Sequence, residues 1–133
     1  MLLSLFLPVR PIVNISATPE NNSFPIGTNI TLNCKAEPRK KDEEYIDRWV
    51  EYIEWYDPRG GGVRATCKQP SKAPAGYTCP LVLKNLTVDE SGRYICQAGN
   101  AYDRHCTRKS FELRILGEKL IIPLIHVMQM QMQ

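Results

Sequence analysis

The chain has 133 residues, with 17 lysines and arginines against 14 aspartates and glutamates, so its net charge is +3 at pH 7. This length suits a single domain with one hydrophobic core. The small excess of positive charge excludes the strongly basic class of nucleic-acid-binding proteins and identifies no other partner.

Residues for acid–base or metal chemistry are scarce. Histidine occurs only as His105 and His126, and neither lies in a motif with a serine or cysteine nucleophile. The pair His105-Cys106 has no second pair at the spacing of metal ligands. We therefore predict no enzymatic activity, no cofactor and no metal site.

The chain begins with an apolar segment, residues 1–10, which we separate from the domain. Its run Met1-Leu2-Leu3-Ser4-Leu5-Phe6-Leu7 matches the apolar part of a secretory signal, but a basic start and a small-residue cleavage site are missing. We interpret it as a short or truncated signal. An upstream strand or a gene-model artefact is the alternative.

Residues 11–117 form the predicted domain. Apolar and polar residues alternate there with a period of two, and Gly, Pro and Asn break the chain into short segments, as in strands of a sandwich. The alternating segments are Ile30–Cys34, Ile53–Trp55, Leu81–Leu83, Tyr94–Ala98 and Phe111–Ile115. Turns are expected at 58–62, which contains three consecutive glycines, and at 89–92.

The segment from Lys40 to Trp55 departs from this alternation. It is highly charged, and Tyr45, Trp49 and Ile53 have the spacing of an apolar stripe on a short helix. The sequence therefore leaves two alternatives, a helical turn inside a long loop or an extended charged loop.

The chain ends in an apolar tail, residues 118–133. Its run from Leu120 to Met128 is about half the roughly 20 residues that a membrane helix needs. We interpret the tail as the beginning of a truncated membrane segment, which would anchor the full-length parent protein, or as a disordered end.

Cysteines and glycosylation sequences both indicate an extracellular location, either secreted or in a cell-surface ectodomain. The cysteines are spread along the chain without the paired spacing of a zinc site, which is typical of disulfide partners in an oxidising compartment. They are Cys34, Cys67, Cys79, Cys96 and Cys106. Asn-x-Ser/Thr sequences occur more often than chance would place them. Their asparagines are Asn14, Asn21, Asn29 and Asn85.

Four of these residues carry a family resemblance. Cys34 and Cys96 lie far apart, with Trp55 between them and Tyr94 two residues before the second cysteine. The run Glu90 to Cys96 follows the pattern Asp-x-Gly-x-Tyr-x-Cys of immunoglobulin domains, and the next residues follow its Cys-x-Ala-x-Asn continuation. The chain thus resembles an immunoglobulin-superfamily domain of the intermediate set, as found in cell-surface receptors and adhesion proteins.

The resemblance implies an all-β fold, an immunoglobulin-like antiparallel β-sandwich in which a Cys34–Cys96 disulfide joins the two sheets. It also implies that Trp55 packs against this disulfide and that the Tyr94 hydroxyl turns back to upstream backbone. Glu90 stands where the family has Asp, so we expect a looser contact there. The interval from Cys34 to Trp55 is long, which predicts an enlarged loop.

The pairing of the other cysteines is open. Cys67 and Cys79 flank a short segment, and we favour their pairing, which leaves Cys106 unassigned and free to bridge to a second chain. In the alternative, Cys106 pairs with one of them and frees the other.

In the implied fold the loop 37–51 and the hairpin 99–108 lie at the same end of the sandwich. Their basic and aromatic residues form a candidate surface for an acidic protein face or a sulfated glycan. Its members are Arg39, Lys40, Lys41, Tyr45, Trp49, Tyr102, Arg104, His105 and Arg108. A solvated loop neutralised by its own acidic residues is the alternative.

We predict from these features an extracellular protein-binding module of a receptor or adhesion protein. Its partner would be a protein ligand or adhesion partner, and edge strands and an unpaired cysteine also permit a homodimer. The alternative function is a structural spacer unit in a tandem array of immunoglobulin domains.

Overall fold

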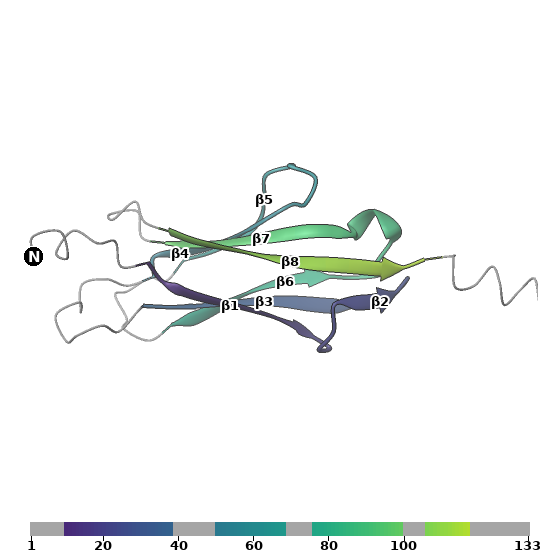
Figure 1. Cartoon of the computed structure of the whole chain (residues 1–133), viewed down its shortest axis with the longest axis horizontal. Coiled ribbons are helices and arrows are strands. Elements are labelled where there is room, and N and C mark those ends of the chain that lie inside the picture. Colours follow the sequence, from purple (N-terminus) through teal and green to yellow (C-terminus); the bar gives the residue numbers. More distant parts are fainter. Residues whose placement is uncertain (1–9, 39–49, 69–75, 100–105, 118–133) are drawn as a thin grey trace, which may run out of the picture.

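The computed structural model describes residues 10–38, 50–68, 76–99 and 106–117, whose strands form two stacked sheets (Figure 1). Three strands form one sheet in the order β1-β3-β6, and five form the other in the order β2-β8-β7-β4-β5. The elements are β1 (Ile12–Thr18), β2 (Ser23–Pro25), β3 (Ile30–Glu37), β4 (Tyr52–Tyr56), β5 (Val63–Lys68), β6 (Tyr77–Leu83), the 3-10 turn η2 (Val88–Glu90), β7 (Gly92–Gly99) and β8 (Cys106–Leu116). The predicted all-β sandwich is confirmed.

Each alternating segment of the sequence lies in a strand, and every second residue of the segment points into one core between the sheets. Leu32, Ile53, Trp55 and Tyr94 are completely buried there. Burial of a large apolar side chain contributes roughly 1.5–3 kcal/mol, so each of these four positions stabilises the fold strongly. Residues 50–55 include the start of β4, so Ile53 belongs to a strand and not to a helical turn. Residues 39–49 lie outside the described part.

Glycines shape the turn between β4 and β5, as the sequence predicted. Gly60 and Gly62 have φ values of +73° and +94°, which side chains with a Cβ rarely adopt. The amide of Asp57 donates to the Gly62 carbonyl at 3.0 Å, and the amide of Gly60 donates to the Asp57 carbonyl at 3.1 Å. This turn is a hairpin and needs no ligand to explain its glycines.

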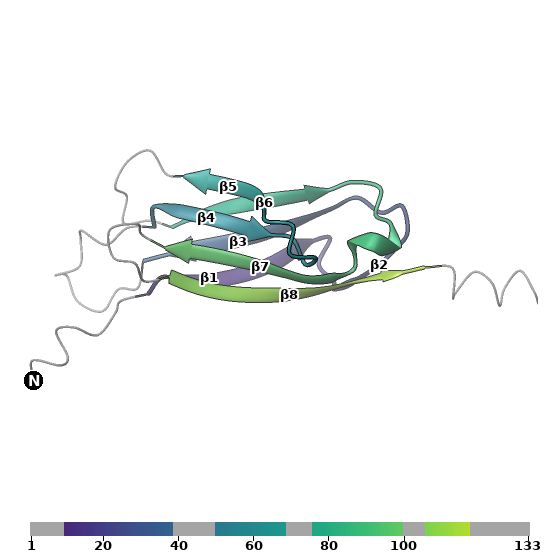
Figure 2. The same ribbon diagram turned by 90° about the horizontal axis from the view of Figure 1, so that it is seen from above.

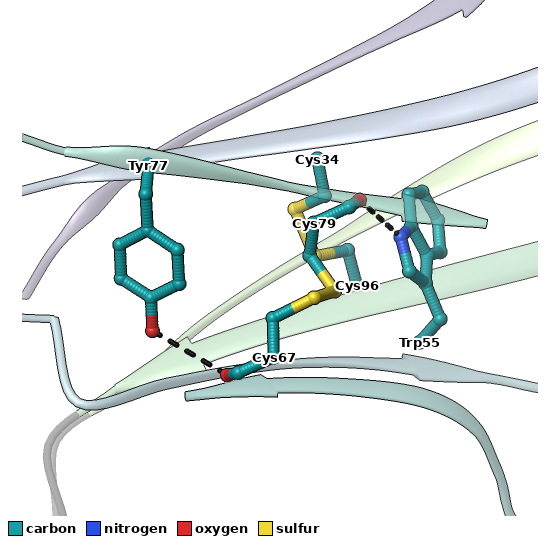
Figure 3. The surroundings of a disulfide bond; sticks show 6 residues. All are labelled: Cys34, Trp55, Cys67, Tyr77, Cys79 and Cys96. Carbon is teal, nitrogen blue, oxygen red and sulfur yellow. Dashed lines mark hydrogen bonds between the residues drawn. A yellow bond between two sulfur atoms is a disulfide. The ribbon is translucent and has the colours of Figure 1, made fainter. Parts of the chain in front are cut away.

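Disulfides join the two sheets at two neighbouring places (Figure 3). Cys34 of β3 is bonded to Cys96 of β7, 62 positions apart in sequence. Cys67 of β5 is bonded to Cys79 of β6, 12 positions apart. Restricting the unfolded chain in this way contributes about 4 kcal/mol for the longer loop and about 3 kcal/mol for the shorter one.

The two disulfides share one buried layer with Trp55. Cys34 and Cys79 lie directly opposite each other on β3 and β6, and Trp55 lies opposite Cys96 on β4 and β7. The Trp55 indole N–H donates to the carbonyl oxygen of Cys79 at 2.9 Å, so its one polar atom is satisfied inside the core (Figure 3). Trp55 therefore packs beside the first disulfide and is hydrogen-bonded to the second.

Tyr94 makes the expected contact with upstream backbone. Its hydroxyl donates to the Glu90 carbonyl oxygen at 2.8 Å and lies 3.1 Å from a Glu90 carboxylate oxygen. The ion pair of Glu90 with Arg64 is long, at 3.7 Å, while Arg64 lies 3.2 Å from Asp57. Glu90 therefore makes short hydrogen-bond contacts with Tyr94 and only a long ion pair with Arg64.

A candidate binding face on the five-stranded sheet

The outer surface of the five-stranded sheet carries a compact group of aromatic and charged side chains. In β4 the buried residues Ile53 and Trp55 alternate with partly exposed residues that point the other way. The same alternation holds in β7, and the register of β8 with β7 places Cys106, Arg108 and Ser110 on the same side as Gln97 and Ile95. We call the outward residues of these three strands the tyrosine face, and they are Tyr52, Glu54, Tyr56, Ile95, Gln97, Cys106, Arg108 and Ser110.

Strand register arranges the tyrosine face in three rows across β4, β7 and β8, which lie side by side in Figure 2. Residues paired across antiparallel strands point to the same side and are neighbours. The rows are Tyr52–Gly99–Cys106, Glu54–Gln97–Arg108 and Tyr56–Ile95–Ser110.

Contacts within the tyrosine face order its long side chains. The Gln97 side-chain amide donates to the Tyr52 hydroxyl at 2.9 Å. Burial of the phenol raises the pKa of Tyr52, so it is neutral at physiological pH. The Arg108 guanidinium lies 5.6 Å from the centre of the Tyr56 ring, within cation–π range. Side chains that are already ordered lose less entropy on binding.

The outer surface of the three-stranded sheet differs sharply in chemistry. Its outward residues on β1, β3 and β6 are mostly polar and without an aromatic ring. They are Ile12, Asn14, Ser16, Thr18, Thr31, Asn33, Lys35, Glu37, Thr78, Pro80 and Val82. Tyr and Arg dominate binding energy in protein interfaces, whereas Ser and Thr contribute little. This sheet is therefore the poorer candidate for binding.

The four glycosylation sequences lie away from the tyrosine face, and all four asparagines are exposed. Asn14 points outward from β1. Asn21 follows the end of β1, Asn29 precedes the start of β3, and Asn85 follows the end of β6. The register places these three strand ends together at one end of the sandwich (Figure 1). Asn29 accepts a hydrogen bond from the Asn85 amide at 2.7 Å, so these two sites are adjacent.

Most of the surface predicted from the sequence lies outside the described residues. These members are Arg39, Lys40, Lys41, Tyr45, Trp49, Tyr102, Arg104 and His105. The remaining member, Arg108, lies on the tyrosine face. Sequence reasoning missed Tyr52, Tyr56 and Gln97, although the alternation that places Ile53 and Trp55 inside also places both tyrosines outside.

Cys106, which the sequence left unassigned, is a free and partly exposed thiol in the structure. It lies in the row of Tyr52, and Gly99 between them has no side chain. Its negative charge, when ionised, contributes to the raised pKa of Tyr52, after the larger effect of burial.

The described ranges contain no group of three or more His, Cys, Asp or Glu side chains placed to hold a metal ion. Among the same residues, no helix has the length and apolar character to cross a bilayer. The tail 118–133, which we interpret from its sequence, lies outside the described part.

Comparisons with solved structures identify the fold. The amphioxus IgVJ-C2 molecule aligns over 80% of this chain with a TM-score of 0.53 and 18% identity. A titin I-band fragment aligns over 80% with a TM-score of 0.50 and 15% identity. A chimeric titin Z1Z2 protein aligns over 83% with a TM-score of 0.51 and 14% identity.

The alignments span 44% of the amphioxus chain, 32% of the titin fragment and 98% of the chimeric titin chain. No family model matches the sequence. At these identities the likeness shows the fold, and this chain is an immunoglobulin-like β-sandwich domain. Its assignment to the intermediate set stays a prediction.

Proposed function

We propose that this domain is an extracellular protein-binding module of a cell-surface receptor or adhesion protein, and that it binds through the tyrosine face. The observation that carries the proposal is the contrast between the two sheets. Ordered Tyr and Arg side chains gather on β4, β7 and β8, three strands without glycosylation sequences, and the opposite sheet presents mostly polar residues and the acceptor Asn14.

The disulfides support an extracellular location. Both bonds join the two sheets, and glutathione and thioredoxin keep such thiols reduced in the cytosol. The exposure of Asn14, Asn21, Asn29 and Asn85 agrees, because a glycosyltransferase needs an accessible asparagine. Glycans at these positions would cover the three-stranded sheet and one end of the sandwich.

The chemistry of the tyrosine face favours a protein over a sulfated glycan as the partner. Its row Glu54–Gln97–Arg108 carries one negative and one positive charge, whereas a sulfated chain would need several adjacent cations. Tyr52 and Tyr56 flank this row and supply flat, amphipathic contact area. A mixed-charge protein surface with its own apolar centre fits this pattern.

An exposed apolar patch favours the second candidate function, a spacer unit in a tandem array. Ile26 is 41% exposed and Val88 is 53% exposed, and both lie beside Gly117, where the chain leaves the sandwich. A following domain seated there would bury both side chains. This function needs no ligand for the tyrosine face.

The proposal is tested by placing a glycan on the tyrosine face. The single substitution Arg108→Asn creates a glycosylation sequence with Lys109 and Ser110 on β8. We expect fluorescent tetramers of the secreted variant to lose at least tenfold in binding to cells and matrix of the expressing tissue, because a glycan on this sheet prevents close docking.

Two controls separate the glycan from other effects. Arg108→Gln removes the charge without adding an acceptor. Ser16→Asn moves the acceptor of β1 from position 14 to position 16, with Thr18 completing it, and stays on the opposite sheet. Unchanged binding by fully glycosylated Arg108→Asn would contradict the proposal, and absence of binding by the parent domain would favour the spacer function.

A further inference from the structure

We infer that the partner of the tyrosine face is a second copy of this chain, placed by a two-fold axis that runs along β7 between the two faces. The inference rests on the proposed function, because it names the partner of the same face. It follows from how the charges and uncharged residues are distributed over β4, β7 and β8.

The middle row is self-complementary. Glu54 on β4 and Arg108 on β8 lie one strand to either side of Gln97 on β7. A two-fold axis parallel to β7 places β4 of one copy over β8 of the other. Each Glu54 then faces the partner's Arg108, and the contact occurs twice because such an interface is isologous.

The axis itself passes over uncharged residues. Ile95 and Gln97 of β7 are partly buried, and each meets the same residue of the second copy. In the row of Ile95, Tyr56 then faces the partner's Ser110. In the row of Gly99, Tyr52 faces the partner's Cys106. No two like charges of the three rows meet, so this arrangement avoids the repulsion that penalises wrong partners.

Glu54 gives an independent reason for a partner with a cation at this position. It is partly buried in the middle row of the tyrosine face, and no cation of the described residues forms an ion pair with it. Stacked sheets lie about 10 Å apart, a gap that an arginine and a glutamate span together. Arg108 is exposed, so its side chain is free to turn from Tyr56 to the partner's Glu54.

The size of the face predicts a weak dimer. Three strands at a spacing of about 4.8 Å give a narrow contact, at the low end of specific interfaces. None of the four glycosylation sequences lies on these strands, so glycans leave the contact open. We expect a dissociation constant in the micromolar range and weaker association at higher salt.

Sedimentation equilibrium of the full chain tests the inference by exchange of charges. All samples carry Cys106→Ser, so that no intermolecular disulfide contributes. Glu54→Arg and Arg108→Glu are each expected to weaken dimerisation at least tenfold, because each places like charges opposite one another. Lys35→Glu, an equal change of charge on the three-stranded sheet, is the control and should leave the dimer unchanged.

Restoration makes the test specific. The double variant Glu54→Arg/Arg108→Glu should dimerise within about threefold of the parent, and an equimolar mixture of the two single variants should form a heterodimer, since both restore opposite charges. Misfolded variants could do neither.

A parent that stays monomeric at millimolar concentration would overturn the inference. A dimer whose dissociation constant is unchanged by both Glu54→Arg and Arg108→Glu would also overturn it. If binding of tetramers to cells is still lost in glycosylated Arg108→Asn, the proposed function stands and the partner is another protein.

Discussion

Tyr94 is completely buried, and its environment favours the neutral phenol. Burial raises the pKa of Tyr94 to about 12, and the nearby negative charge of Glu90 acts in the same direction. The hydrogen bond from the hydroxyl to the Glu90 carboxylate, at 3.1 Å, also favours the protonated form. The folded chain therefore binds this proton more tightly than the unfolded chain does, in which tyrosine titrates near its ordinary value of about 10.

This difference predicts how stability depends on alkaline pH. The contribution of Tyr94 is complete below pH 10 and is lost as the pH rises from 10 through about 12, its pKa in the folded chain. The free energy of unfolding should fall by up to about 1.4 kcal/mol per pH unit in this window. Urea unfolding at a series of pH values measures it.

Tyr94→Phe should remove most of that slope, while Tyr56→Phe, at an outer position, should keep it. Equal slopes in the parent and in Tyr94→Phe would show that this buried phenol does not control the alkaline transition.

At the scale of the element, β5 depends on its disulfide. The strand turns only Ala65 and Cys67 toward the core, and neither is fully buried. It pairs with β4 on one side and forms the edge of its sheet on the other. The Cys67–Cys79 bond therefore holds an edge strand that hydrophobic contacts alone would hold weakly.

Replacement of both cysteines tests this dependence. Cys67→Ala/Cys79→Ala should lower the free energy of unfolding by about 3 kcal/mol, from the loop that the bond closes. Hydrogen exchange, followed by mass spectrometry, should accelerate in β5 and at the start of β6, with β3 and β7 changed only by the global loss of stability. Uniform acceleration across all strands would contradict a local role for this bond.

The same strand shows why sequence reasoning succeeded in part. Where alternation had several apolar residues, as in Ile30–Cys34 and Tyr94–Ala98, the strands were predicted and confirmed. β1 was missed although Val13, Ile15 and Ala17 alternate there with polar residues. β5 was missed because it has few inward residues, and β2 because it has three residues and depends on parallel pairing with β8. Such strands form by pairing with neighbours, a contact that the local sequence does not encode.

The tyrosine face was missed for a related reason. The family resemblance directs attention to the loops at the end of the sandwich, where such domains diversify. Tyr52, Gln97 and Cys106 come from three separated segments, and they become neighbours only through the register of β4, β7 and β8. Arg108 was predicted because it ends the hairpin 99–108.

At the scale of the whole molecule, we assign different roles to the two sheets: the three-stranded sheet carries glycans and the five-stranded sheet binds protein. Carbohydrate at Asn14, Asn21, Asn29 and Asn85 would shield the three-stranded sheet and one end of the sandwich. The tyrosine face would stay open to protein. This division is the central claim, and it depends on oxidised cysteines and occupied acceptors in the natural protein.

A non-reducing peptide map of the chain secreted from eukaryotic cells, with and without enzymatic glycan removal, tests that claim most directly. We predict peptides joined by Cys34–Cys96 and Cys67–Cys79, a modifiable Cys106, and glycans at the four asparagines. Reduced Cys34 and Cys96 together with unmodified asparagines would contradict it, because neither the extracellular location nor the shielding of the three-stranded sheet would then hold.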